Sequence, residues 1–402
     1  MDLYVARQPI LDRKKSLYAY ELLFREGLSN YFPVIDGDEA SSKVLSGSFL
    51  TMGLEKITGK KLAFINFTKN LLYQETPLLF PPETTVIEVL EHISPEPLIL
   101  ERLRFLSQKG YTIALDDFKV RPGMRELIDV SDIVKIDFRS TPAQVIEPLV
   151  VYMKDRNMLL IAEKVETMAE FQTAFNLGFD FFQGYFFCKP EILMTKDISS
   201  TNMNLLTLLA EVNKADFDFG KIETIFVQDV SISYKLLRYI NSSFFSVSRE
   251  ITSIKEAALY LGQDELRRFV SLIAMSKIAR NKPDELVRQA CVKARFCEAI
   301  GKKSKAAVHS NELFTTGLFS NIDAILDQPM PEIMKQLPLS RRIKDTLAGS
   351  KTELSIYLDL IYCYEQGDWN RARQYTKILS IPEDEIPAIY AHACECANYL
   401  TE

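Results

Sequence analysis

The chain has 402 residues, of which 47% are hydrophobic and 25% charged, the balance of a soluble globular protein with room for two domains that each bury a core. Its net charge of −6, with Lys and Arg scattered along the sequence, excludes a surface built to neutralise a nucleic-acid backbone. Three histidines and six cysteines without a C-x-x-C pair argue against a zinc site.

The N-terminal stretch "MDLYVARQPILDRKK" has no apolar run of signal-peptide length. No part of the sequence has an uninterrupted run of the roughly 20 apolar residues that a membrane span needs. We therefore expect a cytoplasmic, reducing location, in which the cysteines are mostly buried as small apolar groups.

The first half of the chain repeats a short run of strand-forming residues followed by a longer helical stretch. The seven runs are "LYAYELLFR", "KLAFINFT", "TTVIEVLE", "YTIALDDF", "DIVKIDF", "MLLIAEKVE" and "FDFFQGYFF". With "LYVARQPILD" pairing ahead of the first run as a hairpin, the count of strands reaches eight. Alternation of strand and helix predicts a TIM-like α/β barrel of parallel strands with one antiparallel strand.

The second half changes character near residue 200, after a polar segment, "KPEILMTKDISSTNMN", that reads as a linker. Beyond it, apolar residues recur at three- and four-residue spacing, which predicts an all-helical domain with helix stops at Asn241 and Gly262. We expect two domains, residues 1–197 and 198–402. Phe269, Phe296, Tyr357 and Trp369 are expected in the core.

Every strand-like run of the first half ends in a polar group. These are Glu21, Asn66, Glu88, the pair Asp116 and Asp117, Lys135 with Asp137, Glu163 and Gln183. In a parallel barrel the strand ends converge on one mouth, and several carboxylates facing one cavity repel one another unless cations lie among them. Oxygen ligands without His or Cys favour Mg²⁺ or Mn²⁺, and two such ions are the usual device for phosphodiester hydrolysis.

Each of these residues also has a simpler interpretation. A single acid at a strand end is commonly a helix N-cap or a solvated loop residue. Lys135 taken alone is a partner for a neighbouring acid, Gln183 a hydrogen-bonding loop residue, and Arg25 a surface residue. A series of seven favours a site over these readings.

The motifs of the first half resemble the EAL domain, the bacterial cyclic di-GMP phosphodiesterase domain. "RQPI" followed by "YELLFR" carries the E-x-L-x-R motif as Glu21, Leu23 and Arg25, and "FINFT", "VIEVLE", "IALDDF", "IVKIDF", "IAEKVET" and "FFQGYFFCKP" follow in order, so the resemblance covers almost all of residues 1–195. "DVSISYKLLRYINSSFFSVSREITSIKEAALYLG" in the second half resembles the HDOD domain, a helical relative of HD-type metal phosphohydrolases.

The resemblance implies cyclic di-GMP as the substrate, linear pGpG as the product, and Mg²⁺ or Mn²⁺ as cofactor. It implies a metal-binding role for Glu21, Asn66, Glu88, Asp116, Asp117, Asp137 and Glu163. Lys135, Glu163 and Gln183 would have catalytic roles, and Arg25, Gln8 and Leu23 would contact the nucleotide. The HDOD domain implies an unidentified signalling protein as partner, and a homodimer stays open.

The sequence departs from the EAL pattern beside the acid pair. EAL enzymes usually continue with a Gly-Thr-Gly type loop, whereas "DDF" here is followed by Lys119 to Gly123. Glycines permit positive φ, whereas Pro122 fixes φ and removes a backbone donor. Glu91, which anchors that loop in the family, is present. The usual "EGVE" reads "EKVE", which places Lys164 beside Glu163, where an inward-facing ammonium would compete with a second metal ion.

The helical half departs further from its HD relatives. Where those hydrolases have an adjacent His and Asp, "GLFSNIDAIL" has Ser320 and Asn321, His309 is isolated, and Asp323 reads as a capping residue. We expect no hydrolase chemistry there and a protein-binding or relaying role instead. Two functions stay open for the whole chain: a cyclic di-GMP binder with weakened hydrolysis, and a catalytically inactive EAL–HDOD adaptor that acts through protein contacts only.

Overall fold

The computed structural model describes residues 5–24, 54–119, 124–188, 205–206, 209, 230–241, 245, 249–280, 282–304 and 310–401. The chain forms two compact units, of which the first comprises Met1–Phe187 with Cys363–Arg371 and the second comprises Cys188–Tyr362 with Ala372–Glu402. The predicted linker and the predicted domain boundary at 197/198 lie outside the described residues, so both stay predictions.

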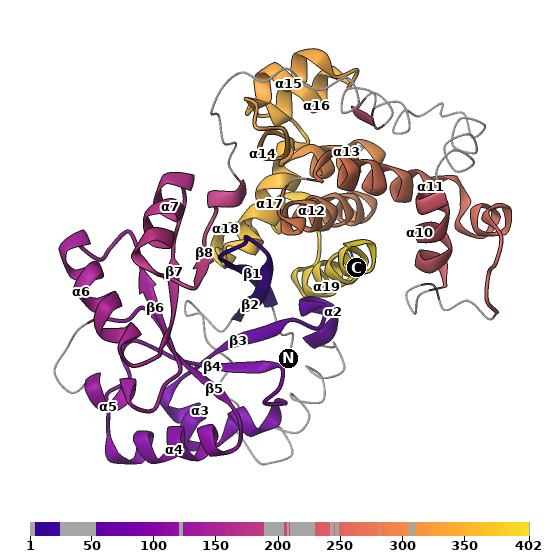
Figure 1. Ribbon diagram of the computed structural model, residues 1–402. Helices are drawn as coiled ribbons and strands as arrows, with labels where there is room; N and C mark the ends of the chain where they lie inside the picture. Colours follow the sequence, from indigo (N-terminus) through magenta and orange to yellow (C-terminus); the bar gives the residue numbers. More distant parts are fainter. Residues whose placement is uncertain are drawn as a thin grey trace. The chain divides into compact units, whose positions relative to one another are not determined.

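The first unit is built on a closed barrel of eight strands in sequence order, seen in Figure 1. The first strand is antiparallel to both of its neighbours and the other seven run parallel, as the sequence predicts. The strands are β1 (Val5–Asp12), β2 (Leu17–Phe24), β3 (Leu62–Phe67), β4 (Thr85–Val89), β5 (Thr112–Leu115), β6 (Ile133–Asp137), β7 (Leu159–Glu163) and β8 (Phe181–Gln183).

One apolar side chain from each of seven strands fills the interior of the barrel. These residues are all at most 1% exposed: Ile10, Ala19, Phe64, Val86, Ala114, Ile133 and Ile161, with Phe181 partly buried against them. Branched and aromatic side chains of this size pack the interior as a core rather than a pore. The layer therefore forms a floor, above which the next inward-facing residues of each strand lie.

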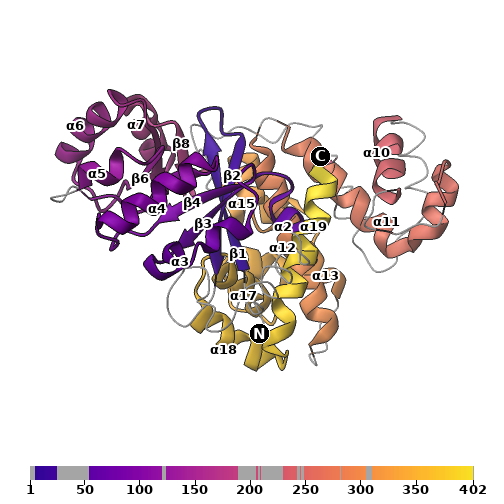
Figure 2. The same cartoon turned by 90° about the horizontal axis from the view of Figure 1, so that it is seen from below.

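Helices lie on the outside of the strands, as Figure 2 shows for α4 to α7. Buried residues of α4, Ile99, Leu103 and Leu106, recur at three- and four-residue spacing and give the helix one apolar face. The helices are α2 (Leu54–Thr58), α3 (Lys69–Tyr73), α4 (Pro97–Gln108), α5 (Met124–Ile128), α6 (Ala143–Lys154) and α7 (Met168–Leu177), with 3-10 turns η1 (Thr76–Leu79) and η2 (Phe186–Cys188).

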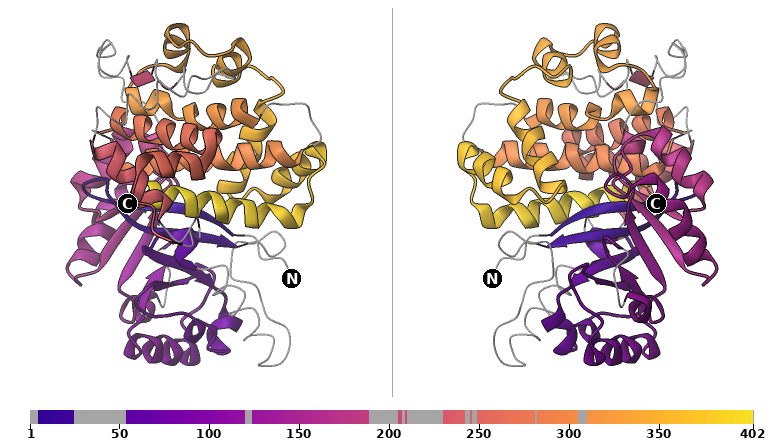
Figure 3. Two further views of the ribbon diagram at one scale, coloured as in Figure 1. Left: turned by 90° about the vertical axis from the view of Figure 1, so that its right-hand side faces the viewer. Right: turned by 90° about the vertical axis from the view of Figure 1, so that its left-hand side faces the viewer.

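The rest of the described chain is helical, as predicted. Figure 3 shows helices of the second unit side by side, and α12 packs against α13 and α19. Gly317 lets α13 approach α12 closely, because a Cβ there would lie 2.5 Å from the Lys293 carbonyl carbon. The helices are α10 (Val230–Ile240), α11 (Ile254–Ile278), α12 (Asp284–Lys303), α13 (Ser310–Phe319), α14 (Ile322–Leu326), α15 (Met330–Gln336), α16 (Arg341–Leu347), α17 (Ser355–Glu365), α18 (Trp369–Leu379), η3 (Glu383–Glu385) and α19 (Ile386–Thr401).

Both predicted helix stops are confirmed. Helix α10 ends at Ile240, and the Asn241 side chain donates to the carbonyls of Leu237 and Ile251. Gly262 has φ +72 and interrupts the helical backbone of α11. The predicted core aromatics are buried, and all six cysteines are free thiols, five of them buried. Among the described residues, no helix has the length and apolar character to cross a bilayer.

Candidate active site

Seven polar side chains follow the apolar floor of the barrel at a constant interval. The pairs of floor residue and polar residue are Ala19–Glu21, Phe64–Asn66, Val86–Glu88, Ala114–Asp116, Ile133–Lys135, Ile161–Glu163 and Phe181–Gln183. Residues two apart on a strand share a face, so these side chains occupy the next layer toward the carboxyl ends of the strands. On the antiparallel β1, Gln8 precedes Ile10 by the same interval and enters the same layer.

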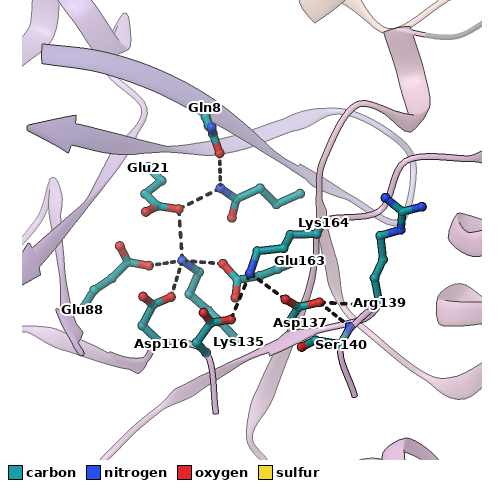
Figure 4. A network of polar contacts seen from close by, with 12 residues as sticks. Gln8, Glu21, Glu88, Asp116, Lys135, Asp137, Arg139, Ser140, Glu163 and Lys164 are labelled. Carbon is teal, nitrogen blue, oxygen red and sulfur yellow. Dashed lines mark hydrogen bonds and ion pairs between the residues drawn. The ribbon is translucent and has the colours of Figure 1, made fainter. Parts of the chain in front are cut away.

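Lys135 lies at the centre of this layer (Figure 4). Its fully buried ammonium lies 2.6 Å from Glu88 Oε1, and 2.9 Å from both Asp116 Oδ1 and Glu163 Oε1. A fourth carboxylate, Glu21 Oε2, is 3.1 Å away. Residues from five strands therefore meet at one nitrogen atom. The interpretation of Lys135 as a partner for neighbouring acids describes this contact set, while a contact with water or phosphate stays a prediction.

The charges in the layer shift several pKa values. Burial disfavours the Lys135 ammonium, but the charges of the surrounding carboxylates outweigh burial and hold the Lys135 pKa well above its usual range. Burial, followed by the Glu21 charge, raises the pKa of Glu88 well above normal. Burial also raises the pKa of Glu163 to about 8, against the attraction of Lys135. Four carboxyl groups thus share a single ammonium, and an additional cation beside them would favour their ionised forms.

Amide side chains fix the orientation of Glu21. Gln183 Nε2 donates to Glu21 Oε2 at 2.7 Å and to Gln8 Oε1 at 3.1 Å, and Asn66 Nδ2 donates to Glu21 Oε1 at 3.1 Å. Both oxygens of this carboxylate are therefore held by donors from β3, β6 and β8. Glu21 is the best-positioned acid of the layer.

The donor atoms of the layer are of the kind that a hard divalent cation prefers. Asn66 Oδ1 and Glu88 Oε2 are buried oxygens that accept no hydrogen bond, and they come from paired positions on β3 and β4. An unsatisfied buried oxygen is costly, and Mg²⁺ and Mn²⁺ prefer such ligands. As the side chains stand, no group of three or more His, Cys, Asp or Glu residues in the described part of the chain is arranged around a metal-sized point. The carboxylates are instead arranged around Lys135.

A second lysine holds the acids nearer the rim. Lys164 Nζ lies 2.6 Å from Asp137 Oδ2 and 3.4 Å from Asp117 Oδ1. Burial opposes ionisation of Asp137, but the hydrogen bond and charge of Lys164 and the hydrogen bonds from Ser140 together outweigh burial and lower the pKa of Asp137. The sequence predicts competition with a metal ion only if this lysine faces inward, and Figure 4 shows it directed at Asp137.

A cavity of about 340 Å³ opens above the layer. Its lining includes the acids Glu21, Asp116, Asp117 and Glu163, the predicted nucleotide contacts Gln8 and Leu23, and Gly184 and Tyr185, which follow β8. The sequence analysis does not single out Gly184 and Tyr185. Their position in the sequence, directly after Gln183, is the feature that could have identified them. Asn66, Glu88 and Lys135 lie below this cavity lining.

Two parts of the sequence prediction fall outside the described residues. Arg25, expected to bind a phosphate, is one, and Val120 to Gly123, most of the altered loop, is the other. Lys119, at the start of that loop, is exposed. The arrangement of the loop over the cavity therefore stays a prediction, as do the functional roles of all the site residues.

In the second unit, a lysine pairs with an asparagine of the stretch in which the adjacent His and Asp of the HD hydrolases are missing. Lys293 Nζ donates to Asn321 Oδ1 at 3.1 Å, and both side chains are buried. Burial raises the pKa of Asp323, which accepts a hydrogen bond from the backbone of Ala324. These contacts lie at the start of α14, and the expected lack of hydrolase chemistry in this unit stays a prediction.

The fold and the layer of acids define a barrel protein with an acidic site at the carboxyl ends of its strands. The EAL domain model matches residues 55–190, and the HDOD domain model matches residues 198–354. Over 95% of its length the chain is 37% identical to cyclic di-GMP phosphodiesterase CdgJ of Vibrio cholerae, covering 89% of that protein. Over its whole length it is 33% identical to protein YuxH of Bacillus subtilis, covering 99% of it. The chain belongs to the family of proteins in which an EAL domain is followed by an HDOD domain.

Solved EAL structures are similar to a little under half of the chain. A standalone EAL protein from Vibrio cholerae O395 with bound c-di-GMP is 23% identical, with a TM-score of 0.35 and coverage of 46% of this chain and 90% of that one. An EAL domain protein from Listeria monocytogenes is 22% identical, with a TM-score of 0.36 and coverage of 46% and 87%.

Proposed function

We propose that the barrel binds cyclic di-GMP together with Mg²⁺ or Mn²⁺ and hydrolyses it slowly to linear pGpG. The observation that carries this proposal is the layer in which Glu21, Glu88, Asp116 and Glu163 converge below an open cavity with only one ammonium among them. Further support comes from the Vibrio cholerae relative, which is named a cyclic di-GMP phosphodiesterase.

Each group in the layer has a defined task in this proposal. Glu21, Asn66, Glu88 and Asp116 would hold a divalent ion, which when bound would neutralise charge that develops on a phosphodiester. Gln183 donates to Glu21 and orients it, and Gln8 accepts from Gln183 and holds that amide in place. Lys135 balances the carboxylates from below. Leu23 and Gln8 face the cavity and would contact the nucleotide, and Arg25 would bind a phosphate.

Slow turnover follows from the departures beside the acid pair. Pro122 restricts the loop that is glycine-rich in EAL enzymes, and a displacement of about 1 Å at a reacting group can lower a rate about a hundredfold. Lys164 already pairs with Asp117 and Asp137. Affinity for the nucleotide depends on the cavity as a whole, and so we expect binding to be retained better than hydrolysis.

The helical second unit would relay the signal by binding a partner protein. Ser320 and Asn321 stand where HD hydrolases have an adjacent His and Asp, and we therefore assign contact with another protein to this unit. A homodimer is a further partner consistent with the proposal. We also infer a cytoplasmic location, because all six cysteines are free thiols.

An adaptor without nucleotide chemistry is the second candidate function. The observation that favours it is that Lys135 and Lys164 already supply cations to the acids of the site. In that case the barrel would be stable as a scaffold without any metal, and both units would act through protein contacts.

Calorimetric titration with cyclic di-GMP, with and without Mn²⁺, distinguishes the two functions. We expect binding heat in the presence of Mn²⁺, slow appearance of linear pGpG by chromatography, and loss of both in Glu88→Ala and Glu21→Ala variants. The Asp323→Asn variant, altered in the helical unit, is the matched control and should behave as the native chain. Absence of heat up to high micromolar nucleotide would rule out the nucleotide-binding function.

A further inference from the structure

Lys164 spans two acids that come from different strand ends. Its ammonium lies 2.6 Å from Asp137 Oδ2 and 3.4 Å from Asp117 Oδ1, a geometry in which one cation bridges two carboxylates. Asp137 ends β6 and Asp117 lies just beyond β5, so the bridge ties together two neighbouring strand ends. In the part of the chain that the structure describes, Lys135 and Lys164 are the lysines that form ion pairs with the acids at the strand ends.

Both carboxylate oxygens of Asp137 already accept hydrogen bonds. Its Oδ1 accepts the backbone N–H groups of Arg139 and Ser140, at 2.9 and 2.8 Å. Its Oδ2 accepts from Lys164. A carboxylate held by two backbone donors and an ammonium is ionised, fixed in position and already neutralised, so it has little to offer a divalent ion.

The backbone at position 164 makes the lysine unusual. Lys164 has φ +57, in the left-handed region that favours glycine, and Asp117 has φ +41. A non-glycine residue with φ in this region carries a conformational cost. The ion pair with Asp137 offsets that cost, which indicates that the side chain of Lys164, and not the backbone alone, has a role at the site.

We propose that Lys164 is a built-in cation that takes the place of a second divalent ion at Asp117 and Asp137, so that the barrel binds one metal ion instead of two. This inference rests on the proposed function for the first ion, which would lie at Glu21, Asn66, Glu88 and Asp116. A divalent ion beside Asp117 would meet a tethered ammonium of the same sign, and the tether keeps that ammonium at high local concentration.

The proposal explains one acid that the sequence analysis placed among the metal ligands. Asp137 acts in this arrangement as the acceptor that positions Lys164. The Lys164 ammonium, which excludes a second metal ion, also faces the cavity lined by Asp116, Asp117 and Glu163. A lysine can contact phosphate oxygens, but it cannot lower the pKa of a bound water as a metal ion does. Nucleotide binding is therefore expected to be retained while hydrolysis is slow.

The test is the number of Mn²⁺ ions bound by the full chain without nucleotide, measured by calorimetry and by electron paramagnetic resonance of free Mn²⁺. Lys164→Met removes the charge and keeps the backbone cost, while Lys164→Gly removes both. We expect one ion for the native chain and the charge-retaining Lys164→Arg variant, and two for the Met and Gly variants. The second ion should bind at least about tenfold more tightly than any second ion in the native chain.

A double variant, Lys164→Met with Asp117→Asn, should return to one ion and so locate the second ion at Asp117. The exposed Lys61→Met variant is a matched control for loss of a lysine and should bind one ion. Two ions in the native chain, or one ion in both the Met and Gly variants, would overturn the inference and leave the proposed function standing. No ion in any variant would overturn both, whereas one ion in Lys164→Met against none in the native chain would support the inference and remove the first metal site.

Discussion

At the scale of single residues, charge balance around Lys135 decides the character of the site. Four carboxyl groups lie within 3.1 Å of the Lys135 ammonium, more than its single charge needs as partners. Removing the lysine should therefore cost much more stability than removing one acid. A buried cation that loses its acids, or acids that lose their cation, are left with uncompensated charge in a medium of low polarisability.

We expect Lys135→Met to lower the free energy of unfolding by about 3–5 kcal/mol, because it leaves several buried carboxylates without a cation. Glu88→Gln should change it by less than about 1 kcal/mol, because the raised pKa of Glu88 means that its ionised form opposes folding. Urea denaturation of both variants at pH 7 measures the contrast. Equal losses in the two variants would contradict this account of the layer.

At the scale of elements, side-chain networks connect neighbouring strands and helices. In the barrel, the hydrogen bonds of Gln183 connect β8 to β1 and β2. In the helical unit, Glu265 of α11 accepts from Tyr239 of α10 at 2.8 Å and from Arg295 of α12 at 3.0 Å. Arg268, one turn beyond on α11, donates to Glu265 at 2.8 Å. Three helices thus share one carboxylate.

The network of Glu265 makes stability depend on pH. Burial opposes its ionisation, but Arg295 and then Arg268 outweigh burial and lower the pKa of Glu265 to about 2. Because the folded pKa lies below the unfolded value of about 4.3, this contribution is present above that value and is lost as the pH falls toward 2. We expect it to amount to about 1–3 kcal/mol.

Thermal unfolding followed by calorimetry between pH 7 and pH 3 measures this contribution. The native chain should lose stability as the pH falls through the acidic range, and Glu265→Gln should be less stable at pH 7 and show a shallower decline. Glu332→Gln, which breaks an exposed pair with Lys335, is the matched control and should follow the native curve. An unchanged slope in the Glu265 variant would show that other groups carry the acid sensitivity.

At the scale of the whole molecule, two units with separate cores divide the proposed tasks. The barrel holds the acids and the cavity, and the helical unit has a buried Lys293–Asn321 pair at the start of α14. A ligand that binds the folded barrel alone stabilises it by mass action, by about 2.7 kcal/mol at a concentration one hundred times its Kd.

We therefore expect cyclic di-GMP with Mn²⁺ to raise the unfolding temperature of the native chain. Asp116→Asn should lose this increase, because it removes an acid of the layer. Asp323→Asn should keep it, because that residue lies in the other unit and its burial already favours the neutral form. A differential scanning measurement on the three proteins decides the point, and an equal increase in the Asp116 variant would place the ligand elsewhere.

Much of the site could be predicted because side chains two residues apart on a strand point to the same face. Floor residues and acids alternate along each strand, so that Val86 and Glu88, or Ile161 and Glu163, reveal an inward face and its polar end. Barrel closure then follows from the count of strands and the hairpin at Ile10 and Ala19. The helix stop at Asn241 is also readable, because its amide can satisfy carbonyls that the ending helix leaves free.

By itself the sequence determined the eight strands, the helical second half, the acids at the strand ends and the presence of a lysine at position 164. Only the tertiary structure decided that the Lys135 ammonium meets Glu21, 114 positions away in sequence, and that Lys164 pairs with Asp137. The physical reason is that strand patterns are local, whereas these contacts depend on closure of the barrel and on the φ of +57 at residue 164. Which cation lies beside which carboxylate is therefore a property of the folded chain.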